Sequence, residues 1–296
     1  MDIQPPQRLT AHVEARPLDT GLYLVATPIG TARDITLRAL DVLNAAEVLA
    51  AEDTRVLRHL LDIHGVPLRG RRVLPYHDHN GDRARPALLA ALAGGASVAY
   101  ASDAGTPLVA DPGFRLAREA AGAGHRVHAI PGPSAPLVAL SLSGLPSDRF
   151  LFAGFPPSTR GARMAWLRQW MAVDATLILF ESPRRVNQTL EEMCEIDANR
   201  VTVVARELTK KFEEVIRGTA AELARDPRMA ALKGEVVMLV DRPGAVEADD
   251  DAIRQALRVR LGRMTVKDAA KEVAAELGLA RRDVYQIALS LGQGEE

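Results

Sequence analysis

Three short motifs combine carboxylates with basic side chains, and each follows an apolar run of strand type. They read AEDTR (51–55), FESPRR (180–185) and RELTK (206–210). A glutamate or a lysine in such a setting can act as a general base when burial and neighbouring charges tune its pKa. The side chains that we select for this role are Glu52, Glu181, Glu207 and Lys210. Ion pairs between domains or on the surface produce the same pattern, so both interpretations stay open.

Three loops rich in glycine, proline and small residues follow other apolar runs. They span 27–34, 102–113 and 130–136, and the second of them reads SDAGTPLVADPG. Glycine permits close approach of a ligand to the backbone, and proline holds a loop in one shape. Tight strand-to-helix turns have a similar composition. Because three such loops follow successive strands, we favour a pocket in which main-chain groups hold a compact ligand.

The same loops exclude several common enzyme classes. The first loop contains a single glycine, so the G-x-G-x-x-G motif of dinucleotide-binding folds is missing, and the chain contains no P-loop motif. Ser134 lies in the sequence GPSAP, which is not the G-x-S-x-G elbow of hydrolases. Hydride transfer, nucleotide hydrolysis and serine hydrolysis therefore lose their usual sequence support.

Composition indicates a globular protein in a reducing compartment. The chain has 296 residues, of which 47% are apolar, and its formal net charge is -1. Nucleic acid would therefore be attracted by local basic patches and not by a global field. Cys194 is the single cysteine, which excludes an intrachain disulfide and a cysteine-rich zinc site. No apolar run approaches the roughly 18 residues of a membrane span, and the N-terminal segment does not resemble a signal peptide. We expect a cytoplasmic protein.

The chain up to residue 146 alternates strand and helix patterns. The predicted strands are 22–27, 48–51, 72–75, 98–101 and 127–130. The predicted helices are 35–43, 55–63, 84–93, 113–122 and 134–143. Asp34 or Thr36 can cap the first of these helices. This alternation predicts a mainly parallel sheet that is covered by helices.

A second series of elements begins at residue 150. The predicted strands are 150–155, 176–180, 201–205, 214–217 and 235–240, and the predicted helices are 160–171, 184–195 and 219–231. Its last strands are joined by short connections, so part of this sheet should be antiparallel. The segment 143–147 is a plausible boundary between the two domains.

A third part follows the acidic run 247–251 and reads as three short helices. Thr265 can cap one helix, and Gly278 interrupts the pattern before the last. This outline is that of a helix-turn-helix, although a helical cap or a dimer contact explains it equally well. The predicted organisation is an extension over 1–19, α/β domains over 20–145 and 146–243, and a helical domain over 250–296.

Several long motifs resemble one known family. They include LYLVATPIGTARDITLRALDVL (22–43), SDAGTPLVADPG (102–113), AIPGPSA (129–135), LSGLPSDRFLFAGFPP (142–157) and GEVVMLV (234–240). Together with the three charged motifs and YHDHN (76–80), they resemble the 16S ribosomal RNA (cytidine-2′-O)-methyltransferase family of the tetrapyrrole-methylase-like class. The resemblance covers residues 20–240 in order, and the C-terminal segment is similar to the helix-turn-helix-like end of that family. Thr31 departs from the asparagine that is usual there.

The resemblance implies two α/β domains with a cleft between them that holds S-adenosyl-L-methionine, and it implies a homodimer. The cofactor contacts that it implies are Ile29, Gly30, Asp103, Gly105, Thr106, Val109, Ser134, Ala135, Phe180, Ala205 and Glu235. Asp103 would face the cationic groups of the cofactor. The methyl acceptor would be a cytidine ribose of small-subunit ribosomal RNA, bound in the assembled subunit. A ribose hydroxyl is a weak nucleophile, so a nearby base would help by roughly 10²–10⁴-fold, and no metal is required.

RNA contacts are expected from arginines and polar side chains beside this cleft. The residues that we select are Arg55, Tyr76, His77, Asn80, Arg184 and Arg206, and the ring of Tyr76 or of His77 could stack on a base. Seven arginines lie between residues 55 and 85, a density that can follow RNA phosphates or simply form a solvated surface. The pair His77 and His79 has no cysteine partner and no third ligand nearby, so a metal site there has weak support.

Two other functions stay open from the sequence. A tetrapyrrole or corrinoid C-methyltransferase would use the same fold, but it would need neither the arginine-rich segment nor the helical tail. A non-enzymatic regulator that reads nucleic acid with its tail would not need the pocket-forming loops.

Overall fold

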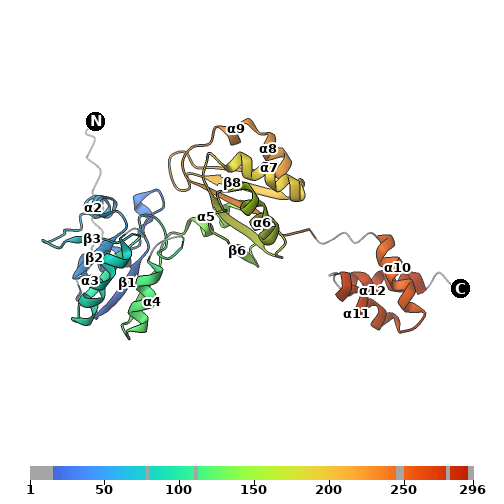
Figure 1. Cartoon of the computed structure of the whole chain (residues 1–296), viewed down its shortest axis with the longest axis horizontal. Coiled ribbons are helices and arrows are strands. Elements are labelled where there is room, and N and C mark those ends of the chain that lie inside the picture. The colour runs from blue at the N-terminus through green and yellow to red at the C-terminus, as the bar shows by residue number, and fades with distance from the viewer. Residues whose placement is uncertain (1–15, 78–79, 110–112, 245–249, 278–280, 293–296) are drawn as a thin grey trace, which may run out of the picture.

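The computed structural model describes residues 16–77, 80–109, 113–244, 250–277 and 281–292 (Figure 1). The predicted extension over 1–19 therefore lies largely outside the described residues. Within the described part of the chain, no helix combines the length and the apolar character needed to cross a membrane.

Five parallel strands form the first sheet, in the order β3-β2-β4-β1-β5. Their bounds are β1 Gly21–Val25, β2 Val48–Ala51, β3 Val73–Pro75, β4 Ser97–Ala101 and β5 Val127–Ile130. β1 and β4 are buried at every position, as expected of central parallel strands covered on both faces. The predicted parallel sheet is confirmed.

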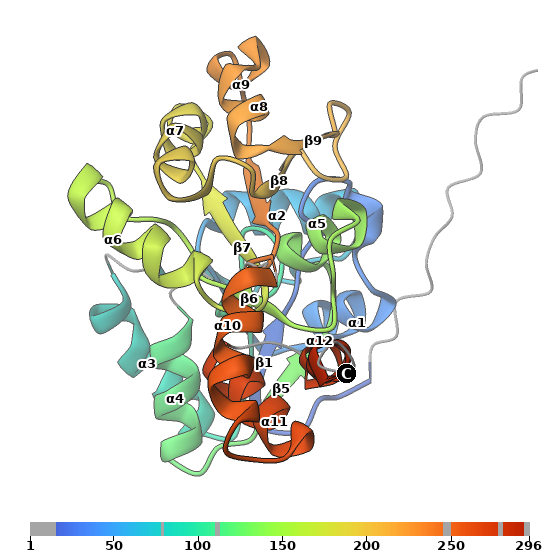
Figure 2. The same cartoon turned by 90° about the vertical axis from the view of Figure 1, so that its right-hand side faces the viewer.

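Helices cover both faces of this sheet. One face carries α1 (Leu37–Ala45) and α2 (Thr54–Ile63), and the other carries α3 (Gly81–Ala93) and α4 (Phe114–Gly122). In Figure 2, α3 and α4 lie to one side of β1 and β5, and α1 lies to the other. A single 3₁₀ turn, η1 (Ala32–Asp34), precedes α1. Of the two predicted caps for α1, Thr36 is the one used, because its side chain accepts a hydrogen bond from the Ala39 N–H at 3.1 Å.

The second sheet has the strand order β6-β7-β10-β8-β9. Its strands are β6 Phe150–Phe152, β7 Thr176–Glu181, β8 Val201–Arg206, β9 Glu214–Thr219 and β10 Val236–Val240. β6 and β7 are parallel, whereas the pairs β7–β10, β10–β8 and β8–β9 are antiparallel. The prediction of a partly antiparallel sheet is confirmed.

One face of the second sheet is covered by α6 (Arg160–Met171), α7 (Val186–Asp197), α8 (Ala220–Arg225) and α9 (Pro227–Ala230). The single helix predicted over 219–231 is therefore wrong. Asp226 caps a new helix by accepting from the Arg228 N–H at 2.9 Å, and Pro227 occupies its first turn. Proline favours a first helical turn and disrupts a helix interior, so the chain divides there.

The other face of the second sheet is covered by α5 (Ala135–Ser143). Ala139 and Leu140 of this helix are buried with Ile178 and Leu239 of the sheet. Arg217 of β9 donates to the Ser143 carbonyl at 3.0 Å and so fixes the end of the helix. By its packing, α5 belongs to the second sheet, whereas the predicted boundary between 145 and 146 assigned it to the first domain. The chain crosses between the domains before α5.

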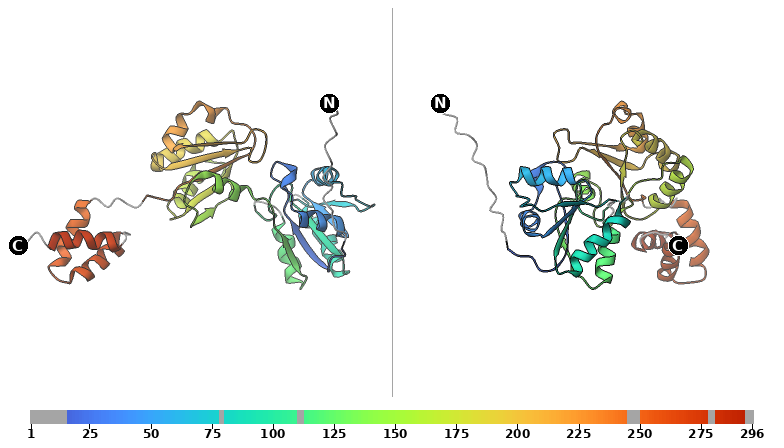
Figure 3. Two further views of the ribbon diagram at one scale, coloured as in Figure 1. Left: turned by 180° about the vertical axis from the view of Figure 1, so that it is seen from behind. Right: turned by 60° about the vertical axis from the view of Figure 1, so that its left-hand side comes forward.

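The C-terminal segment consists of α10 (Asp250–Leu261), α11 (Val266–Leu277) and α12 (Arg281–Gly292). The three helices share a small core of their own, and they form a separate body in the left view of Figure 3. Thr265 caps α11 by accepting from the Asp268 N–H at 3.2 Å, as predicted. The three predicted helices are confirmed, while Gly278 lies outside the described residues.

Candidate active site

Three loops at the carboxyl ends of β1, β4 and β5 are joined by hydrogen bonds. Thr27 and Gly105 exchange two backbone hydrogen bonds of 3.0 Å each. The Thr106 hydroxyl donates to the Pro133 carbonyl at 3.0 Å, which connects the second loop to the third. Gly105 has a φ of +79°, in the left-handed region that favours glycine. The glycine-rich loops therefore form one continuous rim and are not independent turns.

The AEDTR loop is fixed to the same rim. The Asp53 N–H donates to Asp103 Oδ1 at 2.7 Å, and the Asp103 N–H donates to Glu52 Oε1 at 3.4 Å. These reciprocal bonds join the ends of the neighbouring strands β2 and β4. Because Asp103 is held by the backbone, its carboxylate has a defined direction at the rim.

A cavity of about 430 Å³ lies between this rim and the ends of β7 and β10 in the second sheet. Its size is within the range of small-molecule binding sites. The predicted residues that line it are Ile29, Glu52, Asp103, Gly105, Thr106, Val109, Ser134, Ala135, Phe180, Glu181 and Glu235. The structure thus brings together most of the residues predicted for the cofactor, from both domains.

Two predicted cofactor contacts, Gly30 and Ala205, do not line the cavity. Ala205 is fully buried within β8. Gly30 lies against the loop between β8 and β9, where an added Cβ would stand 2.5 Å from Thr209 Oγ1. The Thr31 N–H also donates to Thr209 Oγ1 at 3.1 Å. Gly30 therefore serves a close contact between the two domains, which we call the interdomain clasp (residues 29–31 against 208–210).

Lys210 forms a charged cluster with two glutamates at the edge of the cavity. Its Nζ lies 3.0 Å from Glu207 Oε1 and 3.0 Å from Glu235 Oε2. Burial acts to lower the pKa of Lys210, but hydrogen bonds and charge from the two glutamates outweigh it and raise this pKa. The pKa of Glu207 is lowered, first by the hydrogen bond from the Glu235 N–H. Lys210 and Glu207 are therefore charged at neutral pH, which does not favour Lys210 as a base.

We expect Lys210→Arg to retain at least half of the wild-type turnover, because a guanidinium keeps the positive charge between the glutamates. Its pH–rate profile should follow that of the wild type up to about pH 9, since the raised pKa keeps the lysine protonated over this range. Steady-state rates across pH test this. Loss of all turnover in Lys210→Arg, with the affinity for S-adenosyl-L-methionine intact, would identify Lys210 as the base.

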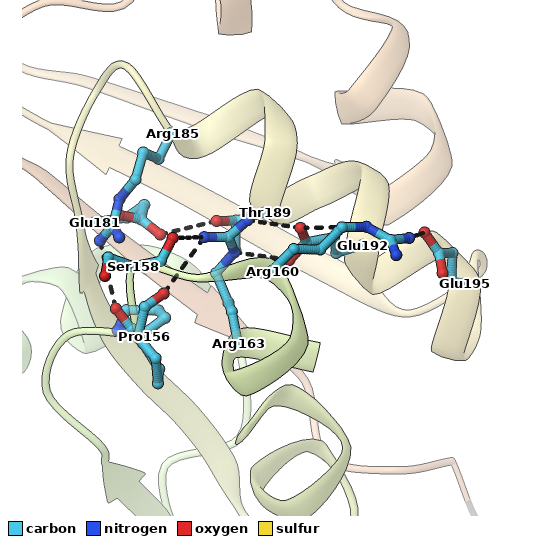
Figure 4. A network of polar contacts seen from close by, with 10 residues as sticks. Pro156, Ser158, Arg160, Arg163, Glu181, Arg185, Thr189, Glu192 and Glu195 are labelled. Carbon is cyan, nitrogen blue, oxygen red and sulfur yellow. Dashed lines mark hydrogen bonds and ion pairs between the residues drawn. The ribbon is translucent and has the colours of Figure 1, made fainter. Parts of the chain in front are cut away.

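Glu181 lies in the wall of the cavity with both carboxylate oxygens occupied (Figure 4). Its side chain is 0% exposed. Oε1 accepts from the Ser182 N–H at 2.7 Å and from Arg185 Nε at 2.8 Å, and Oε2 accepts from the Thr189 hydroxyl at 2.8 Å. Both oxygens are therefore engaged by protein donors, and the carboxylate fixes the wall of the cavity. Glu52 is the other predicted base that lines the cavity, and its Oε1 accepts from the Asp103 N–H at 3.4 Å.

The predicted RNA contacts fall into different environments. Arg55 is 88% exposed, and its hydrogen bonds to the Asp53 carboxylate lower the pKa of Asp53 to about 2. Arg184 is exposed, and Arg206 pairs with Glu214 at 3.0 Å. That these arginines contact RNA stays a prediction.

Tyr76 cannot stack on a base in this structure, so that expectation is not met. It is 1% exposed and packs edge-on against Tyr100 with 5.6 Å between the ring centroids. Asn80 accepts from the His77 N–H at 2.8 Å and so shapes the turn before α3. Asp78 and His79 lie outside the described residues. Among the described residues, no cluster of three or more His, Cys, Asp or Glu side chains could hold a metal.

Several cavity residues were not singled out from the sequence. They are Ala104, Pro136, Phe155, Ser182, Pro183, Gly234, Val236 and Val237. Phe155 is the most distinctive, because it lines the cavity while 57% exposed. The predicted strand 150–155 included Phe155, whereas β6 ends at Phe152 and leaves Phe155 in a loop. A signal for this earlier end was present in the sequence as Gly154, but the second domain offered no glycine-rich loop to direct attention there.

Comparison with known proteins adds independent information. Residues 21–224 match the family model of Tetrapyrrole (Corrin/Porphyrin) Methylases, and residues 247–292 match that of the RsmI C-terminal HTH domain. The chain is 50% identical, over 96% of its length and 97% of the relative, to "Ribosomal RNA small subunit methyltransferase I" of Mesorhizobium japonicum. The protein of the same name from Escherichia coli O157:H7 is 41% identical, with 90% of this chain and 94% of the relative covered.

A solved structure has the same fold. It is a uroporphyrin-III C-methyltransferase from Thermus thermophilus complexed with "S-adenyl homocysteine". Its TM-score is 0.52 at 20% identity, and the match covers 75% of this chain and 97% of the other. At this identity the likeness supports the fold alone.

Proposed function

The chain belongs to the tetrapyrrole methylase family, and on that premise we propose that it methylates small-subunit ribosomal RNA at the 2′-hydroxyl of a cytidine ribose. The methyl donor is S-adenosyl-L-methionine. The relatives that match over nearly the whole chain carry a small-subunit ribosomal RNA methyltransferase name, which supports the RNA substrate. The choice of cytidine, the ribose oxygen, the assembled subunit as substrate, a homodimer and a cytoplasmic location are parts of the proposal.

The cavity fits the donor by shape and by chemistry. A Cβ at Gly105 would come within 3.3 Å of Ile29 Cγ2, and a Cβ at Gly132 within 2.8 Å of the Ala26 Cβ, so both glycines allow the loops of the rim to pack closely together. Asp103 supplies a negative charge for the cationic groups of the donor, and Ile29 and Phe180 supply apolar wall. When bound, S-adenosylmethionine supplies a methyl group already activated on a sulfonium. The residues above need only hold and orient it.

The protein must also place a ribose hydroxyl and accept its proton. Glu52 lines the cavity from the β2 loop, and we assign it the proton. A carboxylate that is positioned by the rim and lines the cavity can serve as a base of this kind. Arg55, three residues further on, is exposed and available to approach an RNA phosphate beside Asp53.

The observation that carries the proposal is the cavity itself, which is lined from both domains by the predicted donor residues. Its test is to incubate the protein and methyl-labelled donor with naked 16S RNA, with isolated small subunits and with porphyrinogens. We expect label in RNA, and most of it with the assembled subunits. Label in the porphyrinogens alone would support a tetrapyrrole C-methyltransferase instead, and failure to bind the donor in calorimetry would support a non-enzymatic regulator.

We expect Asp103→Asn to weaken binding of S-adenosylmethionine about 10-fold, because the amide keeps the oxygen that anchors the Asp53 N–H but removes the charge. The magnitude is that of a hydrogen bond to a charged group. Isothermal titration calorimetry measures the change, with Asp148→Asn, a carboxylate in an exposed ion pair with Arg242, as the matched control. Equal donor affinities for Asp103→Asn and the wild type would show that Asp103 only fixes the loop.

A further inference from the structure

Phe155 is an exposed aromatic side chain that the proposed mechanism does not use. It lies in the loop between β6 and α6 and lines the cavity with 57% of its surface exposed. Its ring centroid is 5.3 Å from that of Phe180, which itself lies 4.9 Å from Phe152. One edge of the ring is therefore supported by other aromatics, while much of its surface faces solvent at the opening of the cavity.

The backbone on both sides of Phe155 is anchored. Before it, the Gly154 carbonyl accepts from the Phe180 N–H at 3.0 Å, and Gly154 has a φ of +72° that turns the chain outward. After it, the Pro156 carbonyl accepts from Arg185 Nη2 at 3.4 Å. Two consecutive prolines, at 156 and 157, restrict this part of the loop further.

A buried arginine holds the next two residues of the loop (Figure 4). Arg163 Nη1 donates to the Pro157 carbonyl at 3.3 Å and to the Ser158 carbonyl at 3.0 Å. Its other nitrogens bind both oxygens of Glu192, at 2.6 and 2.7 Å, and the two side chains are 1% and 3% exposed. The position of Phe155 is therefore set before any ligand binds, which limits the entropy lost on binding.

An exposed arginine follows two cavity residues in the sequence. Ser182 and Pro183 line the cavity together with Phe155, and the next residue, Arg184, is exposed. Within the part of the chain that the structure describes, Arg184 has no ion-pair partner. An exposed flat ring at the cavity and an exposed guanidinium one residue beyond its lining match a nucleotide, which has an aromatic base and a phosphate. An apolar protein surface would use the ring but not the charge.

We propose that Phe155 is the platform on which the base of the target nucleotide stacks, so that its ribose is held at the opening of the donor cavity. This inference rests on the proposed function and adds the residue that binds the base. It replaces Tyr76, whose ring is buried. Single-stranded bases are recognised in this way in many RNA-binding proteins, because every base has a face that can stack on an aromatic ring.

The test compares Phe155→Ala with Phe155→Trp and with Phe150→Ala, a control at an exposed phenylalanine of β6 outside the cavity. The readouts are the KM for small subunits, the donor affinity from calorimetry and the mass from sedimentation. We expect Phe155→Ala to raise the KM for subunits on the order of 10- to 100-fold, the effect of losing one stacked base. Donor affinity and mass should stay unchanged, and Phe155→Trp and Phe150→Ala should behave as the wild type.

Each other outcome overturns the inference. An unchanged KM would show that no base stacks there. A comparable loss of donor affinity in Phe155→Ala would mean that the ring covers the donor, and a change in mass would place it in a contact between copies of the chain. If the wild-type protein transfers label to no RNA in the same assay, the proposed function itself fails and this inference with it.

Discussion

Arg163→Met will destabilise the second domain by about 3–5 kcal/mol, because it leaves the Glu192 carboxylate buried without its partner. Both side chains are almost fully enclosed, and the arginine also satisfies two loop carbonyls. The double variant Arg163→Met/Glu192→Leu should be less destabilised than the single one, since it buries no unpaired charge. The two loop carbonyls would still lose their donor, so we expect the double variant to remain less stable than the wild type by about 1–2 kcal/mol.

Denaturation followed by tryptophan fluorescence measures this effect in the relevant domain. The only two tryptophans of the chain, Trp166 and Trp170, lie on the same helix as Arg163. The matched control is Arg160→Ala, which breaks an ion pair with Glu195 whose side chains are 62% and 48% exposed and removes only a longer contact of 3.9 Å to Glu192. That change should cost less than about 1 kcal/mol. Equal midpoints for Arg163→Met and Arg160→Ala would show that the buried pair does not hold this domain together.

Gly30→Ala will lower kcat/KM on the order of 100-fold by opening the interdomain clasp. The new Cβ would lie 2.5 Å from Thr209 Oγ1 and 2.8 Å from the Leu208 carbonyl oxygen, which is backbone and cannot rotate away. One of the two loops must therefore move. Since the neighbouring Ile29 lines the cavity, this movement changes the distance between its two walls. A displacement of about 1 Å at a reacting centre can produce a loss of this size.

The measurements for this variant are donor affinity, turnover and thermal unfolding. Gly161→Ala is the matched control, because that glycine lies in α6 with nothing within 4 Å of its added Cβ. The control should keep full activity and gain a little stability from the better helix propensity of alanine. A Gly30→Ala protein with wild-type donor affinity and turnover would show that the clasp does not set the geometry of the cavity.

Most of the fold could be predicted because its signals are local. The strands of the first sheet are continuous apolar runs, and the helices between them follow helical spacing. The packing of α5 was missed, although its sequence APLVALSLS contains no charged residue and so indicated a helix buried against another surface. The break at Asp226 and Pro227 was also visible in the sequence as a capping residue followed by proline.

The roles of single site residues could be predicted less well, since they depend on partners far away in the sequence. Gly30 is in the expected loop, but its function follows from its close contact with Thr209. The hydrogen bond from Thr31, the next residue, to Thr209 spans 178 positions in the sequence. The burial of Tyr76, which follows β3, depends on Tyr100 of β4, two strands away in the sheet. A motif specifies which residue types meet at a site. Which side chain stays free for chemistry is decided by the hydrogen bonds that packing creates around it.

The central claim is that the cavity holds a sulfonium methyl donor next to a ribose hydroxyl of ribosomal RNA. It is tested most directly by mass spectrometry of nucleosides from small subunits that lack the modification and have been treated with the protein and donor. We predict a single new product, 2′-O-methylcytidine, which is absent when Asp103 is replaced by alanine. A methyl group on a base, or RNA that stays unmodified while the donor is consumed on another substrate, would contradict the account.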